Sequence, residues 1–265
     1  MSSNTMNNDE LTDELVAFAE FLADEARGIL RAADAAPSDI QYKSDASPVT
    51  DLDRRIEAHI RTFIDDRYPE HGILGEEHGS ERLDADLVWV LDPIDGTAPF
   101  IAGIPVYGTL IGLARHGRPF IGIIDHPATD DRWTGVAGSF ARHNGRPVRT
   151  RGCERLEDAI VTNSNPDYFD THEMRAFTAL KSRVRFVQYG GSCYAYAMLA
   201  SGRTDIGLDA KFDPFDVFAP AAVIEGAGGM MTDWSGNPID LGWSGQVLAA
   251  GCPQMHAQAI SILSG

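Results

Sequence analysis

The sequence has few cysteines and no long apolar run. Its cysteines, Cys153, Cys193 and Cys252, are far apart and lack metal-ligand spacing, which predicts buried, reduced thiols rather than disulfides or a zinc site. No apolar segment approaches the ~18 residues of a membrane-spanning helix. Residues 1–10 are polar and acidic, without the basic start and apolar stretch of a signal peptide. We therefore expect a disordered N-terminal extension and a cytoplasmic protein.

Basic residues are also scarce. The chain has 22 Lys and Arg against 39 Asp and Glu, a formal net charge of −17. Nucleic acids and anionic membranes bind basic surfaces, so this balance argues against both as partners. The excess acid has two interpretations: a well-solvated surface, or carboxylates that hold a cation for an anionic substrate. Only the positions of the acids distinguish the two.

The chain divides into two halves that differ in the order of their predicted helices and strands. In residues 1–150, helical spacing over 11–33 and 54–67 is followed by strand-like runs at 88–91, 107–114 and 120–125, with turns at His116-Gly117 and Asn144-Gly145. This pattern predicts helices packed on an antiparallel sheet. In residues 151–265, strands alternate with helices, which predicts a layered α/β half. The strands are expected at 159–162, 184–189, 205–208, 230–233 and 247–250, and the helices at 171–181, 192–201, 216–226 and from 254. We expect the two halves to form one compact unit.

The segment Asp92-Pro-Ile-Asp-Gly-Thr97 follows the buried run 88–91 and places two carboxylates close together. Such carboxylates repel each other unless a proton or a cation lies between them, and Mg²⁺ prefers carboxylate oxygens. An acidic turn with Asp95 as a helix cap is the plain structural alternative. A haloacid-dehalogenase-like phosphatase is a second alternative, but the spacing would put Ile94 in the place of its nucleophile.

Three further acidic segments have the same ambiguity when each is taken alone. Glu76 lies in Ile73-Leu-Gly-Glu-Glu77, Asp216 opens an apolar stretch after Pro214, and Asp53 ends Ser47-Pro-Val-Thr-Asp-Leu-Asp53. A solvated turn or a helix N-cap explains each one. Their joint occurrence and order have no such structural explanation.

Together the four segments resemble the inositol monophosphatase-like family of Mg²⁺-dependent, lithium-sensitive phosphomonoesterases, and the resemblance runs from Leu11 onward. Asp92–Thr97 with Phe100 resembles the family's first signature; Asp216 with Ala221-Ala222 and 225–229 resembles its second. The segment 189–196 resembles the branch that includes bacterial and plant histidinol-phosphate phosphatases. The resemblance implies a mixed α/β and α+β fold, a layered αβαβα sandwich of the sugar-phosphatase type, and a homodimer.

The resemblance also implies the metal ligands. Glu76, Asp92 and the carbonyl oxygen of Ile94 would bind a first Mg²⁺; Asp92, Asp95 and Asp216 would bind a second; a weaker third ion would lie near Glu76. A metal-activated water aligned by Glu76 and Thr97 would attack phosphorus directly, without a covalent phosphoenzyme. Asp53 would accept a hydrogen bond from the Thr97 hydroxyl.

The remaining predicted site residues concern the substrate. NH groups of Gly96, Thr97 and Ala98 at a helix start would bind the phosphate. By resemblance, Asp209, Gly191 and Ser192 would contact the rest of the substrate. Lys43, in a polar segment rich in helix breakers, matches a mobile loop of the family that closes over the site, although an ordinary surface lysine fits equally well.

The predicted function is therefore hydrolysis of a small phosphomonoester, with L-histidinol phosphate as the leading substrate. Inositol 1-phosphate or another small sugar phosphate is the alternative, because Ala98-Pro99 stands where histidinol-phosphate phosphatases usually carry a basic residue after Gly-Thr. A 3′,5′-bisphosphate nucleotidase is less favoured, since no basic or aromatic clamp for a base is evident. A non-catalytic metal-binding homologue is disfavoured by the joint presence of Asp53, Glu76 and Thr97.

Overall fold

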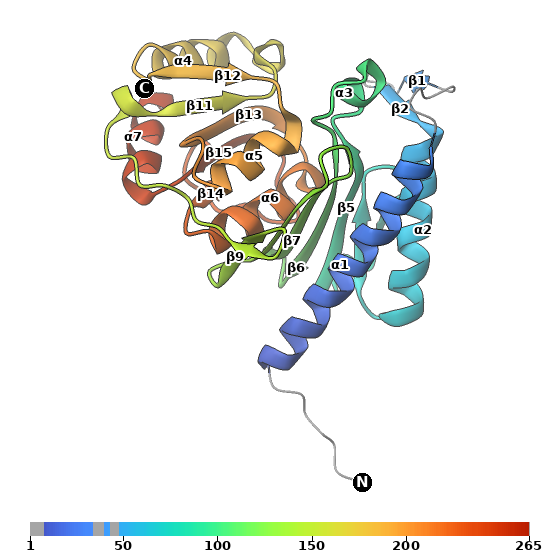
Figure 1. Ribbon diagram of the computed structural model, residues 1–265. Helices are drawn as coiled ribbons and strands as arrows, with labels where there is room; N and C mark the ends of the chain where they lie inside the picture. The colour runs from blue at the N-terminus through green and yellow to red at the C-terminus, as the bar shows by residue number, and fades with distance from the viewer. Residues whose placement is uncertain (1–7, 34–39, 43–47, 265) are drawn as a thin grey trace.

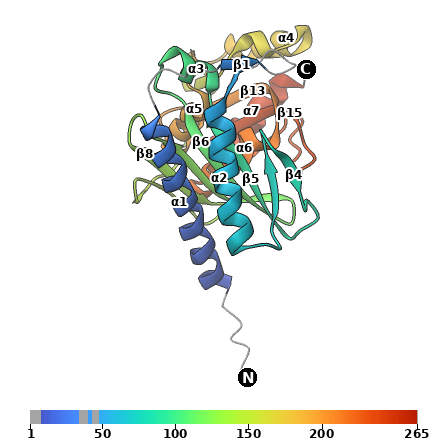
Figure 2. The same cartoon turned by 90° about the vertical axis from the view of Figure 1, so that its right-hand side faces the viewer.

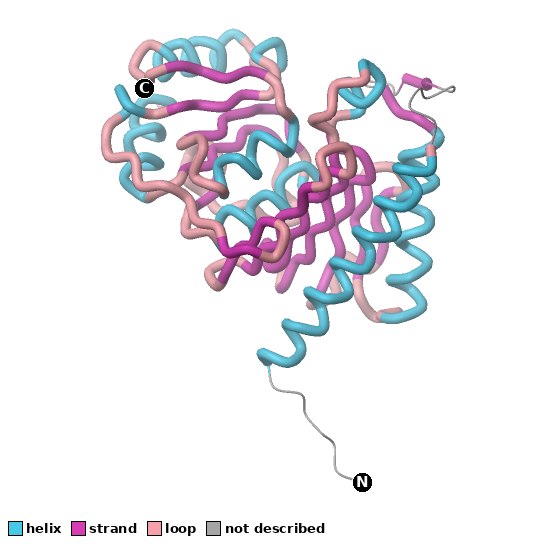
Figure 3. Tube along the Cα trace, viewed as in Figure 1, coloured by secondary structure: helices cyan, strands magenta, loops and turns pink. Residues whose placement is uncertain are grey.

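The computed structural model describes residues 8–33, 40–42 and 48–264, and these form five layers of alternating helix and sheet. Figure 1 shows the layers side by side: outer helices, a large sheet, central helices, a smaller sheet and further outer helices. The same alternation is visible by secondary structure in Figure 3. The predicted layered αβαβα sandwich is confirmed.

The larger sheet belongs to the first half of the chain and has eight strands. Its neighbours are antiparallel except for β3 and β5, which run parallel. Two hairpins turn at His116-Gly117 and Asn144-Gly145, where both central residues have positive φ, as the predicted turns require. In spatial order the strands are β10 (Arg146–Pro147), β9 (Phe140–His143), β8 (Asp131–Val136), β7 (Arg118–His126), β6 (Gly108–Arg115), β5 (Leu87–Asp95), β3 (Gly72–Gly75) and β4 (Gly79–Glu81).

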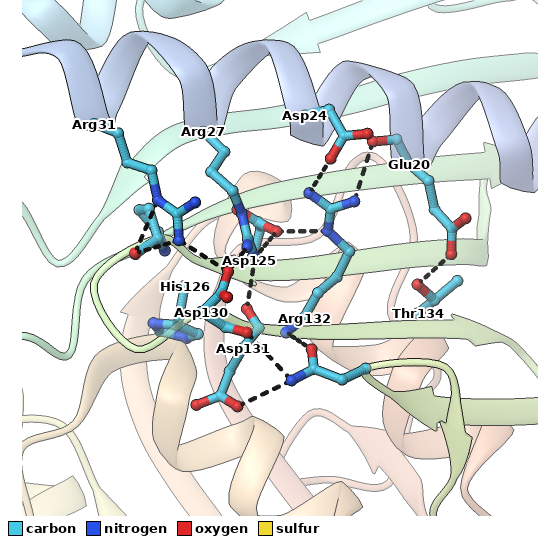
Figure 4. A network of polar contacts seen from close by, with 12 residues as sticks. Glu20, Asp24, Arg27, Arg31, Asp125, His126, Asp130, Asp131, Arg132 and Thr134 are labelled. Atoms are coloured by element: carbon cyan, nitrogen blue, oxygen red, sulfur yellow. Dashed lines mark hydrogen bonds and ion pairs between the residues drawn. The ribbon is translucent and has the colours of Figure 1, made fainter.

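Helices α1 (Asn8–Ala32) and α2 (Asp51–Arg67) cover one face of this sheet, and Figure 2 shows them in front of its strands. Their apolar faces pack on β5, β6 and β7 in one buried cluster. A buried ionic network also attaches α1 to the sheet: Arg27 of α1 and Arg132 of β8 both donate to the carboxylate of Asp125 on β7 (Figure 4). Apolar burial and this network together fix the outer helical layer.

The smaller sheet belongs to the second half and is mixed. The order is β12 (Phe186–Tyr189), β11 (Ile160–Asn163), β13 (Ile206–Phe212), β15 (Gly245–Ala250) and β14 (Met230–Thr232), with β11 parallel to both of its neighbours. Helices α4 (Thr171–Lys181) and α7 (Pro253–Leu263) pack on its outer face. Short 3₁₀ turns, η1 (Leu156–Asp158) and η2 (Pro166–Tyr168), flank β11.

Helices α5 (Ser192–Ala200) and α6 (Pro214–Gly226) fill the layer between the sheets. Both come from the second half, yet α6 packs across β5 to β9 of the first. The approach is close: a Cβ at Gly122 of β7 would lie 2.2 Å from the carbonyl oxygen of Ala219, so only glycine fits there. Three short elements, β1 (Ile40–Tyr42), β2 (Pro48–Thr50) and α3 (Thr97–Ala102), complete the first half.

Most predicted elements are present, with differences at their ends. The prediction of a disordered extension over residues 1–10 is wrong for residues 8–10, because α1 begins at Asn8. Residues 1–7 lie outside the described residues. Strand β5 does not stop at Leu91 but continues through Asp95. Cys153 and Cys193 are buried free thiols as predicted, whereas Cys252 is only half-buried. The predicted mobile-loop residue Lys43 lies outside the described residues. None of the described helices has the length and apolar character needed to span a bilayer.

Candidate active site

An irregularity at the end of β5 places Asp92 and Asp95 on the same side. Residues three apart on a regular strand point to opposite faces. The pairing of β5 with β6 shifts register between these two aspartates. The interval contains Pro93, which has no NH for the ladder. The Thr109 hydroxyl donates to the Pro93 carbonyl oxygen at 2.8 Å and holds the shifted backbone. Because the strand is irregular here, the two carboxylates point to the same side although two residues separate them.

Asp216 approaches the same point from the other half of the chain. It is the third residue of α6, and its Oδ2 accepts a hydrogen bond from the backbone NH of Asp213 at 2.7 Å. One carboxylate oxygen from each of Asp92, Asp95 and Asp216 lies within 4.8 Å of the others, a grouping that could hold a metal ion. The structure therefore brings together three of the predicted metal ligands from two elements.

Glu76 lies beside this cluster because β3 and β5 run parallel. Gly75 is paired with Leu91, and the NH of Glu76 donates to the Leu91 carbonyl oxygen at 3.1 Å, so Glu76 leaves β3 level with Asp92. The negative charge of Glu76 contributes to raising the pKa of both Asp92 and Asp216. Glu76 therefore lies close enough to the cluster for its charge to act on both aspartates.

The cluster is strongly acidic and poorly compensated. Asp92 is 2% exposed, and its Oδ1 has no hydrogen-bond partner among the described residues. Burial raises the pKa of Asp92 well above its ordinary value, and the charges of Glu76, Asp95 and Asp216 raise it further. Burial also raises the pKa values of Asp95 and Asp216. An unpaired carboxylate oxygen amid three other acids fits a hard divalent cation, which prefers oxygen ligands and would neutralise the repulsion.

The start of α5 forms the opposite wall. The backbone NH of Cys193 donates to Asp95 Oδ2 at 2.6 Å, so α5 holds this carboxylate directly. A Cβ at Gly96 would lie 2.6 Å from Ser192 Oγ, so the loop after Asp95 rests against the helix start. Gly191 and Ser192 both have positive φ, at 113° and 45°. The predicted substrate residue Ser192, which follows Gly191, therefore lies next to the predicted phosphate-binding residue Gly96, the N-cap of the short helix α3.

Asp209 lies behind this wall and is saturated by protein donors. It is 1% exposed, and its carboxylate accepts hydrogen bonds from the Tyr196 hydroxyl at 2.7 Å, from the NH and hydroxyl of Ser164, and from the Asn163 amide. Burial raises its pKa to about 7 although these donors oppose the shift. The predicted substrate contact of Asp209 stays a prediction, and it requires the carboxylate to exchange one of these partners for a ligand.

The predicted hydrogen bond from Thr97 to Asp53 is not formed in this structure. The Thr97 hydroxyl donates to the Ile94 carbonyl oxygen at 3.1 Å. Asp53 Oδ2 instead accepts from the NH and hydroxyl of Thr50, at 2.8 and 2.5 Å, and so satisfies donors at the start of α2. Asp53 and Thr50 thus form the capping box that begins α2, a local arrangement of residues three apart. Asp53 is nonetheless buried, at 1% exposed.

Two groups near the site were not among the predicted residues. The backbone NH of Cys193 carries no sequence signature. Glu57 does: it is a fully buried acid on the apolar face of α2, between Ile56 and Ile60 and four residues before Arg61. Charged residues are rarely buried without a partner. An acid and an arginine spaced four apart on the apolar stripe of a helix were therefore a readable signal.

Comparison with known proteins agrees with this geometry. The sequence model of the inositol monophosphatase family matches residues 11–264. The bifunctional phosphatase IMPL2 of Arabidopsis thaliana is 39% identical over 271 residues, covering 99% of this chain and 78% of the plant protein. A histidinol-phosphatase of Chlorobaculum parvum is 33% identical, covering 78% of this chain and 80% of its own. Among solved structures, an inositol monophosphatase from Zymomonas mobilis superposes with a TM-score of 0.87 at 37% identity, covering 96% of this chain and 98% of that one.

Proposed function

Because the chain belongs to the inositol monophosphatase family, and is therefore a phosphoric monoester hydrolase, we propose that it uses Mg²⁺ to hydrolyse L-histidinol phosphate to L-histidinol. The observation that carries the metal dependence is the buried cluster of Asp92, Asp95 and Asp216, whose oxygens lie within 4.8 Å of one another. Family members act on small phosphate esters and use Mg²⁺, and these residues fit that ion.

In the proposed site, Glu76, Asp92 and the Ile94 carbonyl oxygen would hold one Mg²⁺, and Asp92, Asp95 and Asp216 would hold another. A weaker third ion is assigned near Glu76. Bound Mg²⁺ supplies Lewis acidity, which offsets phosphate charge and acidifies water. Glu76 would accept the proton of the attacking water, and the Thr97 hydroxyl, which donates to the Ile94 carbonyl oxygen, would orient that water. The NH groups of Gly96, Thr97 and Ala98 are assigned to the phosphate.

The substrate assignment rests on relatives of this chain. The Chlorobaculum parvum relative is a histidinol-phosphatase, and the plant relative, at 39% identity, is a bifunctional phosphatase. Inositol 1-phosphate is the second candidate, because the Zymomonas mobilis structure, at 37% identity, is an inositol monophosphatase. Asp209 with Gly191 and Ser192 is proposed to discriminate between them, since a carboxylate suits the amine of histidinol. A cytoplasmic homodimer, lithium sensitivity and a role in histidine biosynthesis belong to the same proposal.

Phosphate release from a panel of esters tests the proposal. The panel contains histidinol phosphate, inositol 1-phosphate, a second sugar phosphate and adenosine 3′,5′-bisphosphate, each with Mg²⁺ and with EDTA. We expect release only with Mg²⁺, and the highest kcat/KM for histidinol phosphate. If inositol 1-phosphate is hydrolysed equally well, the substrate assignment fails.

A variant pair tests the metal ligands in the same assay. Asp95→Asn removes a carboxylate of the cluster and is expected to abolish most activity. Asp158→Asn is the matched control, because this half-exposed carboxylate pairs with Arg185 away from the cluster. Equal phosphate release by Asp95→Asn and the wild type would refute the proposed two-metal site.

A further inference from the structure

A buried carboxylate next to the site has no part in the proposed chemistry. Glu57, on the inner face of α2, is 0% exposed. Its Oε2 accepts a hydrogen bond from the backbone NH of Glu77 at 2.8 Å, and its Oε1 accepts one from the NH of His78 at 3.1 Å. These two NH groups immediately follow Glu76, so Glu57 holds the backbone on the C-terminal side of the proposed ligand.

The backbone on the N-terminal side of Glu76 lies against the same carboxylate. A Cβ added to Gly75 would be 2.0 Å from Glu57 Oε1 and 2.4 Å from its carboxyl carbon, so no side chain fits there. Gly75 is at the same time paired with Leu91 of β5. The Glu57 carboxylate therefore contacts the backbone on both sides of Glu76: it packs against Gly75, and it accepts hydrogen bonds from the NH groups of Glu77 and His78.

Arg61 makes this buried charge tolerable and ties it to the next strand. Its Nε donates to Glu57 Oε1 at 2.9 Å, and its Nη1 donates to Glu81 Oε1 at 3.1 Å. Its Nη2 donates to the Gly79 carbonyl oxygen. One ion pair on α2 thus anchors both ends of the turn between β3 and β4. Such a pair with additional hydrogen bonds is the arrangement in which a buried charge can be retained.

We propose that Glu57 is a positioning residue that sets the backbone of residues 75–78, so that the Glu76 carboxylate is presented to the metal cluster. The proposal rests on the proposed function, because it takes Glu76 as a metal ligand. Glu57 itself touches neither substrate nor cluster; it acts through Glu76. The competing interpretation is that the Glu57–Arg61 pair only stabilises the β3–β4 hairpin.

Direct Mg²⁺ binding without substrate separates the two interpretations. Isothermal titration calorimetry is performed on the wild type, Glu57→Gln and a control, Asp205→Asn. In Glu57→Gln an amide NH₂ replaces one acceptor oxygen, so a bond to Arg61, Glu77 or His78 is lost. We expect its Mg²⁺ affinity to fall about ten- to a hundredfold, the usual effect of losing a partner that orients a ligand. The Mg²⁺ concentration for half-maximal phosphate release is expected to rise in parallel.

Asp205 is a matched control because it is equally buried and bonded alike. Its carboxylate accepts two hydrogen bonds from Arg151, at 2.7 and 2.6 Å, and one from the NH of Ile160, in the smaller sheet. Asp205→Asn should lower the melting temperature without changing the Mg²⁺ dissociation constant. If Glu57→Gln binds Mg²⁺ like the wild type while losing as much stability as Asp205→Asn, the positioning role is refuted.

Two further results complete the test. If Glu57→Gln does not fold, Gly75→Ala, which presses a methyl group onto the Glu57 carboxylate, is titrated in its place, and unchanged Mg²⁺ affinity refutes the role. Failure of the proposed function itself looks different: the wild type would then neither bind Mg²⁺ nor release phosphate. A wild type that does both, beside a Glu57→Gln variant that matches it, refutes the positioning role alone.

Discussion

Two buried carboxylates, on the two strands that flank β6, have opposite electrostatic surroundings. Asp125 on β7 accepts hydrogen bonds from Arg27 at 2.7 and 3.0 Å and from Arg132 at 2.5 Å, as Figure 4 displays. Asp92 on β5 instead faces Glu76, Asp95 and Asp216, and its Oδ1 has no hydrogen-bond partner among the described residues. The charge of Asp125 is neutralised by two arginines of the chain, whereas the charge of Asp92 would be neutralised only by a bound cation. Uncompensated burial, rather than burial alone, marks the functional carboxylate.

The largest expected effect comes from breaking the uncompensated cluster. Asp92→Asn removes the carboxylate assigned to both ions, so we expect kcat for phosphate release to fall about 100- to 1000-fold, the scale of losing a principal source of electrostatic stabilisation. Steady-state kinetics at saturating Mg²⁺ measure it. A fall of less than about tenfold would remove Asp92 from the centre of the site.

Breaking the compensated carboxylate should affect stability instead. Asp125→Asn leaves Arg27 and Arg132 without their shared buried partner, and such a change lowers the free energy of unfolding by about 3–5 kcal/mol. Urea denaturation in Mg²⁺ measures the loss, while kcat per folded molecule should remain close to the wild type. A stable variant with impaired catalysis would reverse the distinction between the two carboxylates.

Asp209 is a third buried carboxylate, and neutral hydrogen-bond donors surround it. Burial raises its pKa from 3.8 to about 7, so the folded state retains a proton that the unfolded state releases. Its contribution to stability is therefore fully present below about pH 4 and is lost as pH rises through about 7, by up to ~4 kcal/mol. Asp209→Asn should lose less stability than the wild type between pH 4 and 8 in urea denaturation with EDTA. Parallel pH profiles would show that Asp209 does not titrate in this range.

The smallest effect concerns a single donor to that carboxylate. Tyr196→Phe removes the hydroxyl that donates to Asp209 Oδ2 at 2.7 Å, which should lower the free energy of unfolding by about 1–2 kcal/mol at pH 8. The loss should be smaller at pH 5, where Asp209 is protonated and accepts more weakly. Denaturation at both pH values checks this, and a larger loss at pH 5 would contradict the assigned charge.

Much of the fold was predictable because apolar periodicity and turn residues are local signals. The amphipathic spacing of α1 and α2 and the turn at Asn144-Gly145 are read from neighbouring residues. The site was predictable only through its motifs. The irregularity between Asp92 and Asp95 depends on how β5 pairs with β6, and the role proposed for Glu57 depends on a turn some twenty residues away. The bond between Thr50 and Asp53, by contrast, is local, and it realises the capping alternative that was open for Asp53 from its sequence neighbours.

Thermal unfolding of the wild type and Asp92→Asn, in EDTA and in Mg²⁺, shows whether the buried acidic cluster needs a cation. Since burial and like charges raise the Asp92 pKa, its charged form destabilises the metal-free protein at neutral and higher pH. We predict that in EDTA at pH 8 Asp92→Asn melts at a higher temperature than the wild type, and that Mg²⁺ raises the melting temperature of the wild type far more than that of the variant. A variant that melts lower in EDTA, with a wild type indifferent to Mg²⁺, would contradict the claim that this cluster requires a cation.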